Sequence, residues 1–172
     1  MPPDSGSITY AGRELAGMSD AERSALRRSE FGFVFQFGQL VPELTCVEER
    51  GAAAPAERPP PQAGRAGRAD LDGAAGGGRP QDKRPGEVSG GQGQRVAVAR
   101  ALVTGPRVVF ADEPTGALDS LNGERVMELL TDAARSTNAA VVLVTHEARV
   151  AAYSDREIVV RDGRSRDMER AI

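Results

Sequence analysis

The residues Ser89-Gly90-Gly91-Gln92 have the types and order of a helix start that could bind an anion. Ser89 and Gln92 have the spacing of a capping box, in which each side chain accepts a hydrogen bond from the other residue's backbone N–H. Gly90 and Gly91 have no Cβ, so an anion could approach the first-turn N–H groups, where the helix dipole favours negative charge. A cap alone would explain Ser89 but not two glycines, each of which weakens a helix by roughly 1 kcal/mol. We therefore expect an anionic group near both glycines.

Two acidic residues and the single histidine each follow an apolar run. Asp112 and Glu113 come directly after residues 108–111, and His146 comes just after residues 139–144. Continuous apolar runs favour strands of a parallel sheet that are covered on both faces, and ligands bind at the carboxyl ends of such strands. In a phosphate site Asp112 would hold Mg²⁺ and Glu113 would take a proton from the attacking water. Solvated loop carboxylates and a core histidine are the alternatives that these residues alone leave open.

The elements that must place these residues can be predicted from the sequence pattern. A helix follows the Ser89 cap, and a second helix spans residues 120–138 with Val126, Leu129, Leu130 and Ala133 on one side. A strand, a helix and a strand with this spacing form a unit with parallel strands, which puts His146 at the same sheet edge as Asp112 and Glu113. Residues 155–167 predict a last strand with a turn at Asp162-Gly163.

The amino-terminal part has ordinary globular patterns. Residues 5–15 predict a short β-hairpin, and residues 18–30 predict a helix, since Ser19 and Glu22 have capping-box spacing. Residues 31–37 form an apolar run that predicts a strand with Gln36 near its end.

Composition limits the classes of protein that the chain can be. Its 172 residues suit one domain, or a domain and a fragment, and 22 Lys and Arg against 25 Asp and Glu give a net charge of -3. This charge supplies no strong positive field for nucleic acid. Cys46 is the only cysteine and is expected to be a free, buried thiol. The sequence shows no signal peptide and no long apolar run, which favours an intracellular protein without a membrane span.

Residues 51–80 differ in composition from the rest of the chain. Ala, Gly, Pro and Arg make up most of the segment, and Leu71 is its only large apolar residue. Burial of so little apolar surface cannot offset a backbone ordering cost of about 1 to 2 kcal/mol per residue, so we expect disorder over residues 51–84. The codons of these four amino acids begin with two G or C bases. A pair of compensating frameshifts is therefore one explanation, and a real flexible insertion is the other.

The motifs, in this order, resemble those of the ATP-binding subunit of ABC transporters. The stretches FGFVFQ, VSGGQGQRVAVARAL, VVFADEPTGALDS and VTHE carry the resemblance. It is greatest to the branch that works with lipoprotein-release and macrolide-export permeases. It implies an α/β fold of the P-loop NTPase type, with a mostly parallel sheet, helices on both faces and an amino-terminal antiparallel hairpin. Residues 1–50 and 85–172 are the parts that match, and 51–84 replace the family's helical subdomain.

The resemblance implies a role for each matching residue. Gln36 matches the glutamine that senses the metal and the γ-phosphate, Asp112 and Glu113 match the Walker B pair, and His146 matches the switch histidine. The signature motif matches Ser89, Gly90, Gly91 and Gln92, and Asp119 matches the loop that couples two subunits. ATP and Mg²⁺ are the implied substrate and metal.

One family motif is missing from the chain. The phosphate loop, G-x-x-x-x-G-K-[ST] (Walker A), does not occur in the 172 residues, and the first residues resemble the family's sequence just after its first helix. We therefore expect a truncated or wrongly started copy that is inactive alone.

The resemblance also implies partners and a location. The expected protein is an ATP-hydrolysing subunit of an export or lipoprotein-release transporter. It would form a head-to-tail dimer with a second ATP-binding subunit and would lie on the inner face of the cell membrane through permease subunits. The alternative is a non-catalytic partner, or a fragment, that lends only its signature to an intact subunit's ATP.

Overall fold

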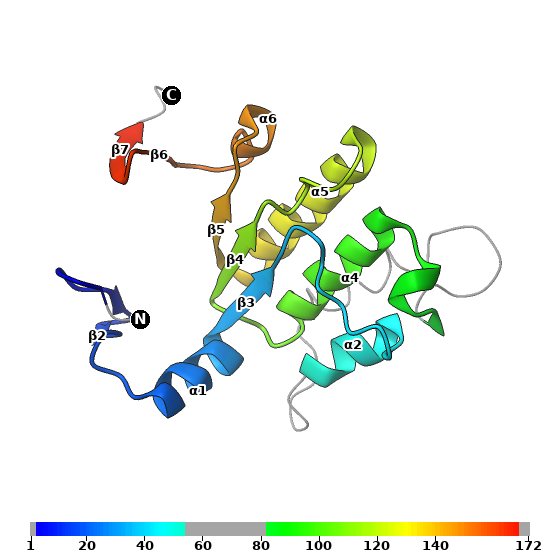
Figure 1. Ribbon diagram of the computed structural model, residues 1–172, viewed down its shortest axis with the longest axis horizontal. Coiled ribbons are helices and arrows are strands. Elements are labelled where there is room, and N and C mark those ends of the chain that lie inside the picture. Colours follow the sequence, from blue (N-terminus) through cyan, green and yellow to red (C-terminus); the bar gives the residue numbers. More distant parts are fainter. Residues whose placement is uncertain (1–2, 54–81, 169–172) are drawn as a thin grey trace.

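The computed structural model of the protein describes residues 3–53 and 82–168 (Figure 1). The strands are β1 Thr9–Tyr10, β2 Arg13–Glu14, β3 Phe31–Val34, β4 Val108–Asp112, β5 Ala140–Val144, β6 Glu157–Arg161 and β7 Arg164–Met168. The helices are α1 Asp20–Glu30, α2 Cys46–Ala53, α4 Gly90–Leu102, α5 Ser120–Thr137 and α6 Ala148–Ala151, with a short 3₁₀ helix, η2, at Pro85–Glu87.

Three parallel strands in the order β3-β4-β5 form the central sheet. The connection from β4 through α5 to β5 is the predicted strand-helix-strand unit, and its strands are parallel as predicted. The antiparallel hairpin β1-β2 is also present as predicted. The expected α/β architecture is thereby confirmed.

The core lies between the sheet and the helices α4 and α5. In Figure 1, α5 lies behind the sheet and α4 lies to the right of β3. Buried side chains of both helices form one cluster with β3 and β4; its members are Val34, Val98, Ala101, Leu102, Val109, Ala111, Val126, Leu129, Leu130 and Ala133. The four apolar residues predicted to share one side of α5 are all in this cluster. Burial of each valine or leucine side chain in the cluster contributes on the order of 1.5 to 3 kcal/mol, so the cluster holds α4 and α5 against β3 and β4.

The opposite face of the sheet is less covered. Phe33 of β3 stacks on Phe110 of β4 with ring centroids 5.5 Å apart, and Phe31 packs edge-on against Phe110 at 5.3 Å. On β5, which is paired beside Phe110, the side chains of Val142 and Val144 are 46% and 56% exposed. Among the residues described, α4 and α5 therefore cover one face, and the burial expected for both faces of these strands is not seen.

Two hairpins lie beside the sheet (Figure 1). The amino-terminal hairpin is joined to the sheet through Tyr10, whose ring packs 5.0 Å from that of Phe31 and whose hydroxyl donates to Glu30. The hairpin β6-β7 turns at Asp162 and Gly163, which have φ angles of 50° and 70°. Left-handed angles at both positions are those of a type I′ turn, so the turn predicted there is confirmed.

The disorder expected over residues 51–84 can be compared with the structure only at the two ends of that segment. Helix α2 continues to Ala53, past the expected boundary at residue 50, while residues 54–81 lie outside the described part of the chain. The backbone N–H of Cys46, at the start of α2, donates to the carbonyl of Lys83 at 2.8 Å. The two flanks of the segment are therefore in direct contact. Cys46 is a free, buried thiol, as expected.

Candidate functional site

The carboxyl ends of β4 and β5 bring the acidic pair and the histidine to one edge of the sheet. Asp112, the last residue of β4, is paired with Val144, the last residue of β5. Beyond the strands, the backbone N–H of Glu113 donates to the Val144 carbonyl at 2.9 Å. The side chains that follow the two strands therefore emerge next to one another, as the parallel unit predicts.

Glu113 and His146 are in direct contact. Oε1 of Glu113 lies 2.7 Å from Nδ1 of His146 and accepts the backbone N–H of His146 at 3.1 Å. The hydroxyl of Thr145 donates to Oε2 at 3.3 Å. Three donors thus fix a carboxylate that is 20% exposed, while the imidazole beside it is 80% exposed. The arrangement suits a carboxylate that accepts a proton next to an imidazole that faces a ligand.

The contact changes the acid–base behaviour of the histidine. The hydrogen bond to Glu113, and then the negative charge of Glu113, raise the pKa of the His146 imidazole above its ordinary value. Glu113 itself has a φ angle of 44°, in the left-handed region that side-chain-bearing residues rarely adopt. Such strain persists where surrounding contacts impose it, and here the bonds to Val144, Thr145 and His146 do so.

Gln36 lies in a turn rather than at the end of a strand. The predicted strand 31–37 ends at Val34, because the carbonyl of Phe35 accepts from Gly38 N and from Nε2 of Gln94 instead of continuing the ladder. The turn brings the Gln36 amide against the loop after Glu113: a Cβ on Gly116 would lie 2.8 Å from Gln36 Nε2. Only a glycine at position 116 leaves the amide room to lie there.

The two residues predicted to bind a metal ion, Asp112 and Gln36, offer few ligand atoms. Within residues 3–53 and 82–168, no group of three or more His, Cys, Asp or Glu side chains is placed to hold a metal ion. Asp112 is exposed at the end of β4 and offers one carboxylate, and Gln36 offers one amide oxygen. These hard oxygen donors suit Mg²⁺, which in nucleotide sites takes one or two protein ligands and completes its shell with water and phosphate.

The signature residues start α4, as predicted. Ser89 Oγ accepts from Gln92 N at 3.3 Å, and Gln92 Oε1 accepts from Ser89 N at 2.9 Å, which confirms the capping box. Gly90 is exposed, and a Cβ added to it would have its nearest neighbouring atom at an ordinary 3.7 Å. Gly91 is buried, and a Cβ there would lie 2.6 Å from Asn122 Oδ1. The space beside the Cα of Gly91 is therefore used for the packing of α4 on α5, and the anion-binding role of both glycines stays a prediction.

Asp119 caps the other helix of this contact. Its Oδ1 accepts from Asn122 N at 2.9 Å, and its Oδ2 accepts from the Asn122 side-chain amide at 2.7 Å. These two bonds, the backbone one first, lower the pKa of the Asp119 carboxyl. Asn122 thus touches both the signature helix and Asp119. Sequence reasoning missed Asn122, although its place three residues after an N-cap aspartate is a usable signal.

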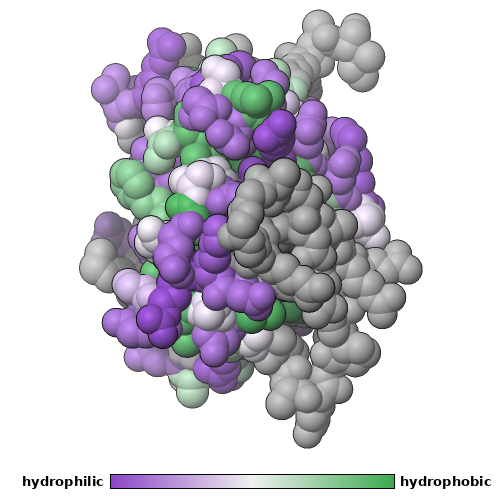
Figure 2. Space-filling view, turned by 90° about the vertical axis from the view of Figure 1, so that its right-hand side faces the viewer, coloured by the Kyte–Doolittle hydropathy of each residue, from purple (hydrophilic) through white to green (hydrophobic). Residues whose placement is uncertain are grey.

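The signature start and Gln36 border the same pocket. Its volume is about 280 Å³, and its walls include Gln36, Ser89, Gly90, Pro85 and Leu118. The described residues on the face that Figure 2 shows are mostly hydrophilic, with hydrophobic residues in scattered groups.

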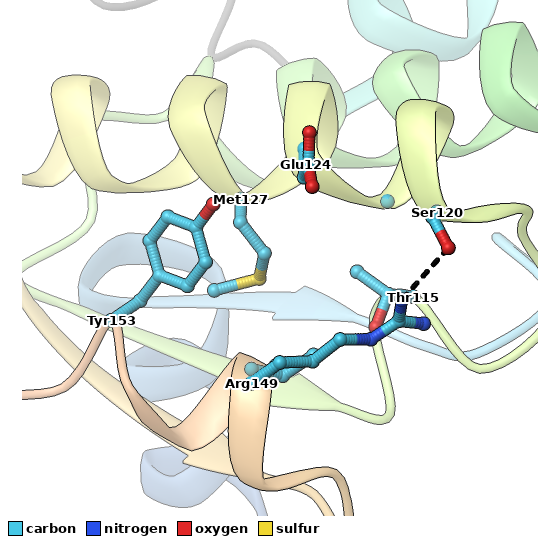
Figure 3. A pocket seen from close by; sticks show the side chains of 8 residues that line it. Thr115, Ser120, Glu124, Met127, Arg149 and Tyr153 are labelled. Carbon is cyan, nitrogen blue, oxygen red and sulfur yellow. Dashed lines mark hydrogen bonds between the residues drawn. The ribbon is translucent and has the colours of Figure 1, made fainter.

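A second pocket, of about 200 Å³, lies between α5 and α6 (Figure 3). Met127 and Tyr153 face it from its two sides, and Arg149 donates to Ser120 Oγ at 2.8 Å across it. None of the predicted site residues lines this pocket. The Arg149–Ser120 bond ties the segment after His146 to the helix that Asp119 caps.

The comparisons with known proteins agree with these motifs. The protein-family profile described as "ABC transporter" matches residues 1–116. The chain is 45% identical over 162 residues to a macrolide export ATP-binding/permease protein, MacB 1/2, of Paracoccus denitrificans (strain Pd 1222), covering 94% of this chain but 24% of that protein. It is 38% identical over 161 residues to the lipoprotein-releasing system ATP-binding protein LolD of Shewanella oneidensis, covering 94% of this chain and 70% of that protein.

Solved structures give the same result. The dimeric structure of MJ0796, a bacterial ABC transporter cassette, matches with a TM-score of 0.78 and 34% identity, covering 97% of this chain and 75% of that chain. A dimeric post-hydrolysis state of MJ0796 bound to ADP and Pi matches with a TM-score of 0.77 and 32% identity over the same shares. Among the described residues, none of the helices has both the length and the apolar character needed to cross a bilayer.

Proposed function

Because the chain belongs to the ABC transporter family, we propose that it supplies the hydrolytic part of an ATP-binding subunit of the export or lipoprotein-release type. The observation that carries the proposal is the contact between Glu113 and His146 at the carboxyl ends of β4 and β5. In phosphoryl transfer the protein contributes mainly positioning and charge, and this edge presents both a proton acceptor and a cation-forming imidazole.

Each site residue has a proposed part in ATP hydrolysis. Glu113 accepts a proton from the attacking water, and His146 contacts the γ-phosphate from the exposed side of the pair. Asp112 and Gln36 would hold Mg²⁺, which neutralises negative charge on the phosphates.

The proposed assembly has two ATP-binding subunits and permease subunits in the membrane. The signature at the start of α4 would face a phosphate held by the partner subunit through Ser89, Gly90, Gly91 and Gln92. Asp119 would lie where the two subunits are coupled. The similarity to a cassette solved as a dimer supports this arrangement. The subunit would lie at the inner face of the membrane, held there by the permease.

Replacing the proposed base gives the first test. In a longer chain that also carries a phosphate loop and a helical subdomain, Glu113→Gln should stop ATP hydrolysis while ATP stays bound. The substitution removes the proton acceptor but leaves the metal ligands and the phosphate contacts. Phosphate release and retained nucleotide are the measurements, and near-normal turnover of the variant would show that Glu113 is not the base.

The 172 residues by themselves should bind ATP weakly. Phosphate loops hold the nucleotide with backbone N–H groups and a lysine, and no such motif occurs in this sequence. Loss of two charge-assisted hydrogen bonds costs roughly 3 to 6 kcal/mol, or about 10² to 10⁴ in affinity. The check is Mg·ATP titration and phosphate release with the purified chain alone, and micromolar binding or steady turnover would contradict the expectation.

A second candidate is a non-catalytic partner that lends its signature to an intact subunit. The observation in its favour is that Ser89 and Gly90 are exposed at a fully formed helix start. Mixing the chain with an intact ATP-binding subunit of this family should then raise ATP hydrolysis, and Ser89→Arg should remove the gain. Activity in the mixture that is insensitive to Ser89→Arg, but lost with Glu113→Gln, would favour the first candidate.

A further inference from the structure

We propose that Arg100 is a positioning residue that holds the loop carrying Gln36 against helix α4. This loop, residues 35–41, is called the glutamine loop below. Arg100 lies in the last turn of α4, and its guanidinium donates through Nη2 to the Gly38 carbonyl and through Nη1 to the Gln39 carbonyl, both at 2.8 Å. The planar fork of a guanidinium suits two carbonyls at once, which a lysine could not match.

A second side chain of the same helix holds the start of the loop. Nε2 of Gln94 donates to the Phe35 carbonyl at 2.8 Å, and Gln94 is 3% exposed. A buried amide that lost this partner would be left without a hydrogen bond, which is unfavourable, so the bond is not readily exchanged for another. Two residues of α4 therefore hold three backbone carbonyls of one loop.

Glu49 of α2 completes the arrangement from the other side. This glutamate is 3% exposed, and its Oε2 lies 3.4 Å from Arg100 Nη1. Its Oε1 accepts the backbone N–H of Val41, at the far end of the loop. The Arg100 side chain is itself only 18% exposed, so each charge of the pair depends on the other for compensation.

The side-chain hydrogen bonds described here therefore hold the glutamine loop to α4 and α2 rather than to the preceding strand β3. The Gln36 amide, next to Gly116, is placed by bonds made at Phe35, Gly38, Gln39 and Val41. The helix that Ser89 caps thus also carries Gln94 and Arg100, the two residues that hold the glutamine loop of its own chain. Any effect of this loop on ATP hydrolysis rests on the proposed function, whereas the bonds that hold the loop do not.

The test uses the whole chain without nucleotide. Since the chain has no tryptophan, Phe37→Trp places a single fluorophore on the loop at a side chain that is 77% exposed. In this background, at low micromolar concentration, Arg100→Ala should lower the tryptophan anisotropy. Hydrogen–deuterium exchange of residues 35–41 should become about tenfold faster, because loss of a charge-assisted bond shifts a local opening equilibrium by that order.

Matched variants separate positioning from general stability. Arg135→Ala removes an exposed arginine from the last turn of α5 and should leave the loop unchanged. Arg100→Lys keeps the charge and should restore the anisotropy only in part. Glu49→Gln keeps an acceptor for Val41 N–H, so it should loosen the loop less than Glu49→Ala.

Two results would overturn the proposal. One is parent-like anisotropy and loop exchange in both Arg100 variants. The other is equal acceleration of exchange in the loop, β4 and α5, which would mean that Arg100 only stabilises the fold. Neither result depends on whether the protein hydrolyses ATP, so a failure here is distinct from a failure of the proposed function.

Discussion

Glu113 combines two properties at the scale of a single residue. Its backbone has a left-handed φ of 44°, and its carboxylate accepts bonds from Thr145 and His146. A residue in this conformation costs of order 1 to 3 kcal/mol. From this backbone conformation the Glu113 carboxylate reaches both Thr145 and His146, the two residues that follow β5.

The acid–base coupling of this pair can be measured directly. Glu113→Gln should lower the pKa of His146 toward its ordinary value, because the hydrogen bond and then the charge of Glu113 are the main causes that raise it. Because the pKa of His146 is raised in the folded state, the contact contributes its full stabilisation of the fold below the ordinary histidine pKa. This stabilisation is lost as the pH rises through the raised pKa. The pair should therefore loosen on the alkaline side.

The measurement is a proton NMR titration of His146, the only histidine, in a chain without a histidine tag. Glu147→Gln is the control, since the charge of Glu147 also raises the pKa of His146 but is the smallest of the causes. An unchanged pKa in Glu113→Gln would show that the contact does not persist in solution.

At the scale of elements, the packing of α4 on α5 sets the position of the signature start. Gly91 and Asn122 meet where the two helices begin, and Asn122 also bonds to the Asp119 cap. The side chain of Asn122 therefore contacts both helix starts. A displacement of the start of α4 or of α5 would therefore also displace Asn122 and the start of the other helix.

Gly91→Ala should destabilise the fold by about 1 to 3 kcal/mol, the usual cost of adding a methyl group to a tight contact. The added Cβ would lie 2.6 Å from Asn122 Oδ1, whereas a Cβ on Gly90 has ordinary space. The midpoint of urea unfolding should fall for Gly91→Ala and not for Gly90→Ala. In the Asn122→Ala background, Gly91→Ala should cost less free energy of unfolding than it does in the parent. If the effects of the two substitutions on this free energy simply add, they contradict a direct clash.

The parts that could be predicted from the sequence are those whose signals are local. The capping boxes at Ser19 and Ser89 and the Asp162-Gly163 turn depend on neighbours within three residues, and the parallel unit follows from apolar runs of the right spacing. The end of β3 and the burial of Gly91 could not be predicted, because partners distant in the sequence set both. Phe35 is bonded by Gln94, 59 residues later, and Gly91 is opposed by Asn122 on another helix.

At the scale of the whole molecule, β5 ends the central sheet within the described ranges. Its outer side chains Val142 and Val144 are exposed, and the strand order leaves one edge of β5 without a neighbouring strand in that part of the chain. Unpaired N–H and C=O groups next to apolar side chains favour pairing between molecules. We therefore expect the isolated chain to aggregate as its concentration rises.

Replacing both valines should reduce this association. The double variant Val142→Thr, Val144→Thr keeps β-branched side chains but makes the exposed row polar, so light scattering at a given concentration should fall. Val47→Thr makes the same chemical change at a 37% exposed site on α2 and serves as the control. Equal scattering by the parent and the double variant would count against association through these two valines, and a sharp and reversible thermal transition of the parent would count against aggregation of the isolated chain.

The bond between Cys46 N–H and the Lys83 carbonyl has a consequence for how this protein can change over evolution and in engineering. It joins the start of α2 to Lys83, two residues before η2, so the described residues on the two sides of residues 54–81 are held within about the length of one short helix. For a flexible connection whose ends are already held together, each doubling of length costs only about 0.6 kcal/mol. Sequences of very different length could therefore be exchanged between α2 and η2 while Arg100, Glu49 and the glutamine loop keep their places. The position is a natural point for grafting another unit onto the protein.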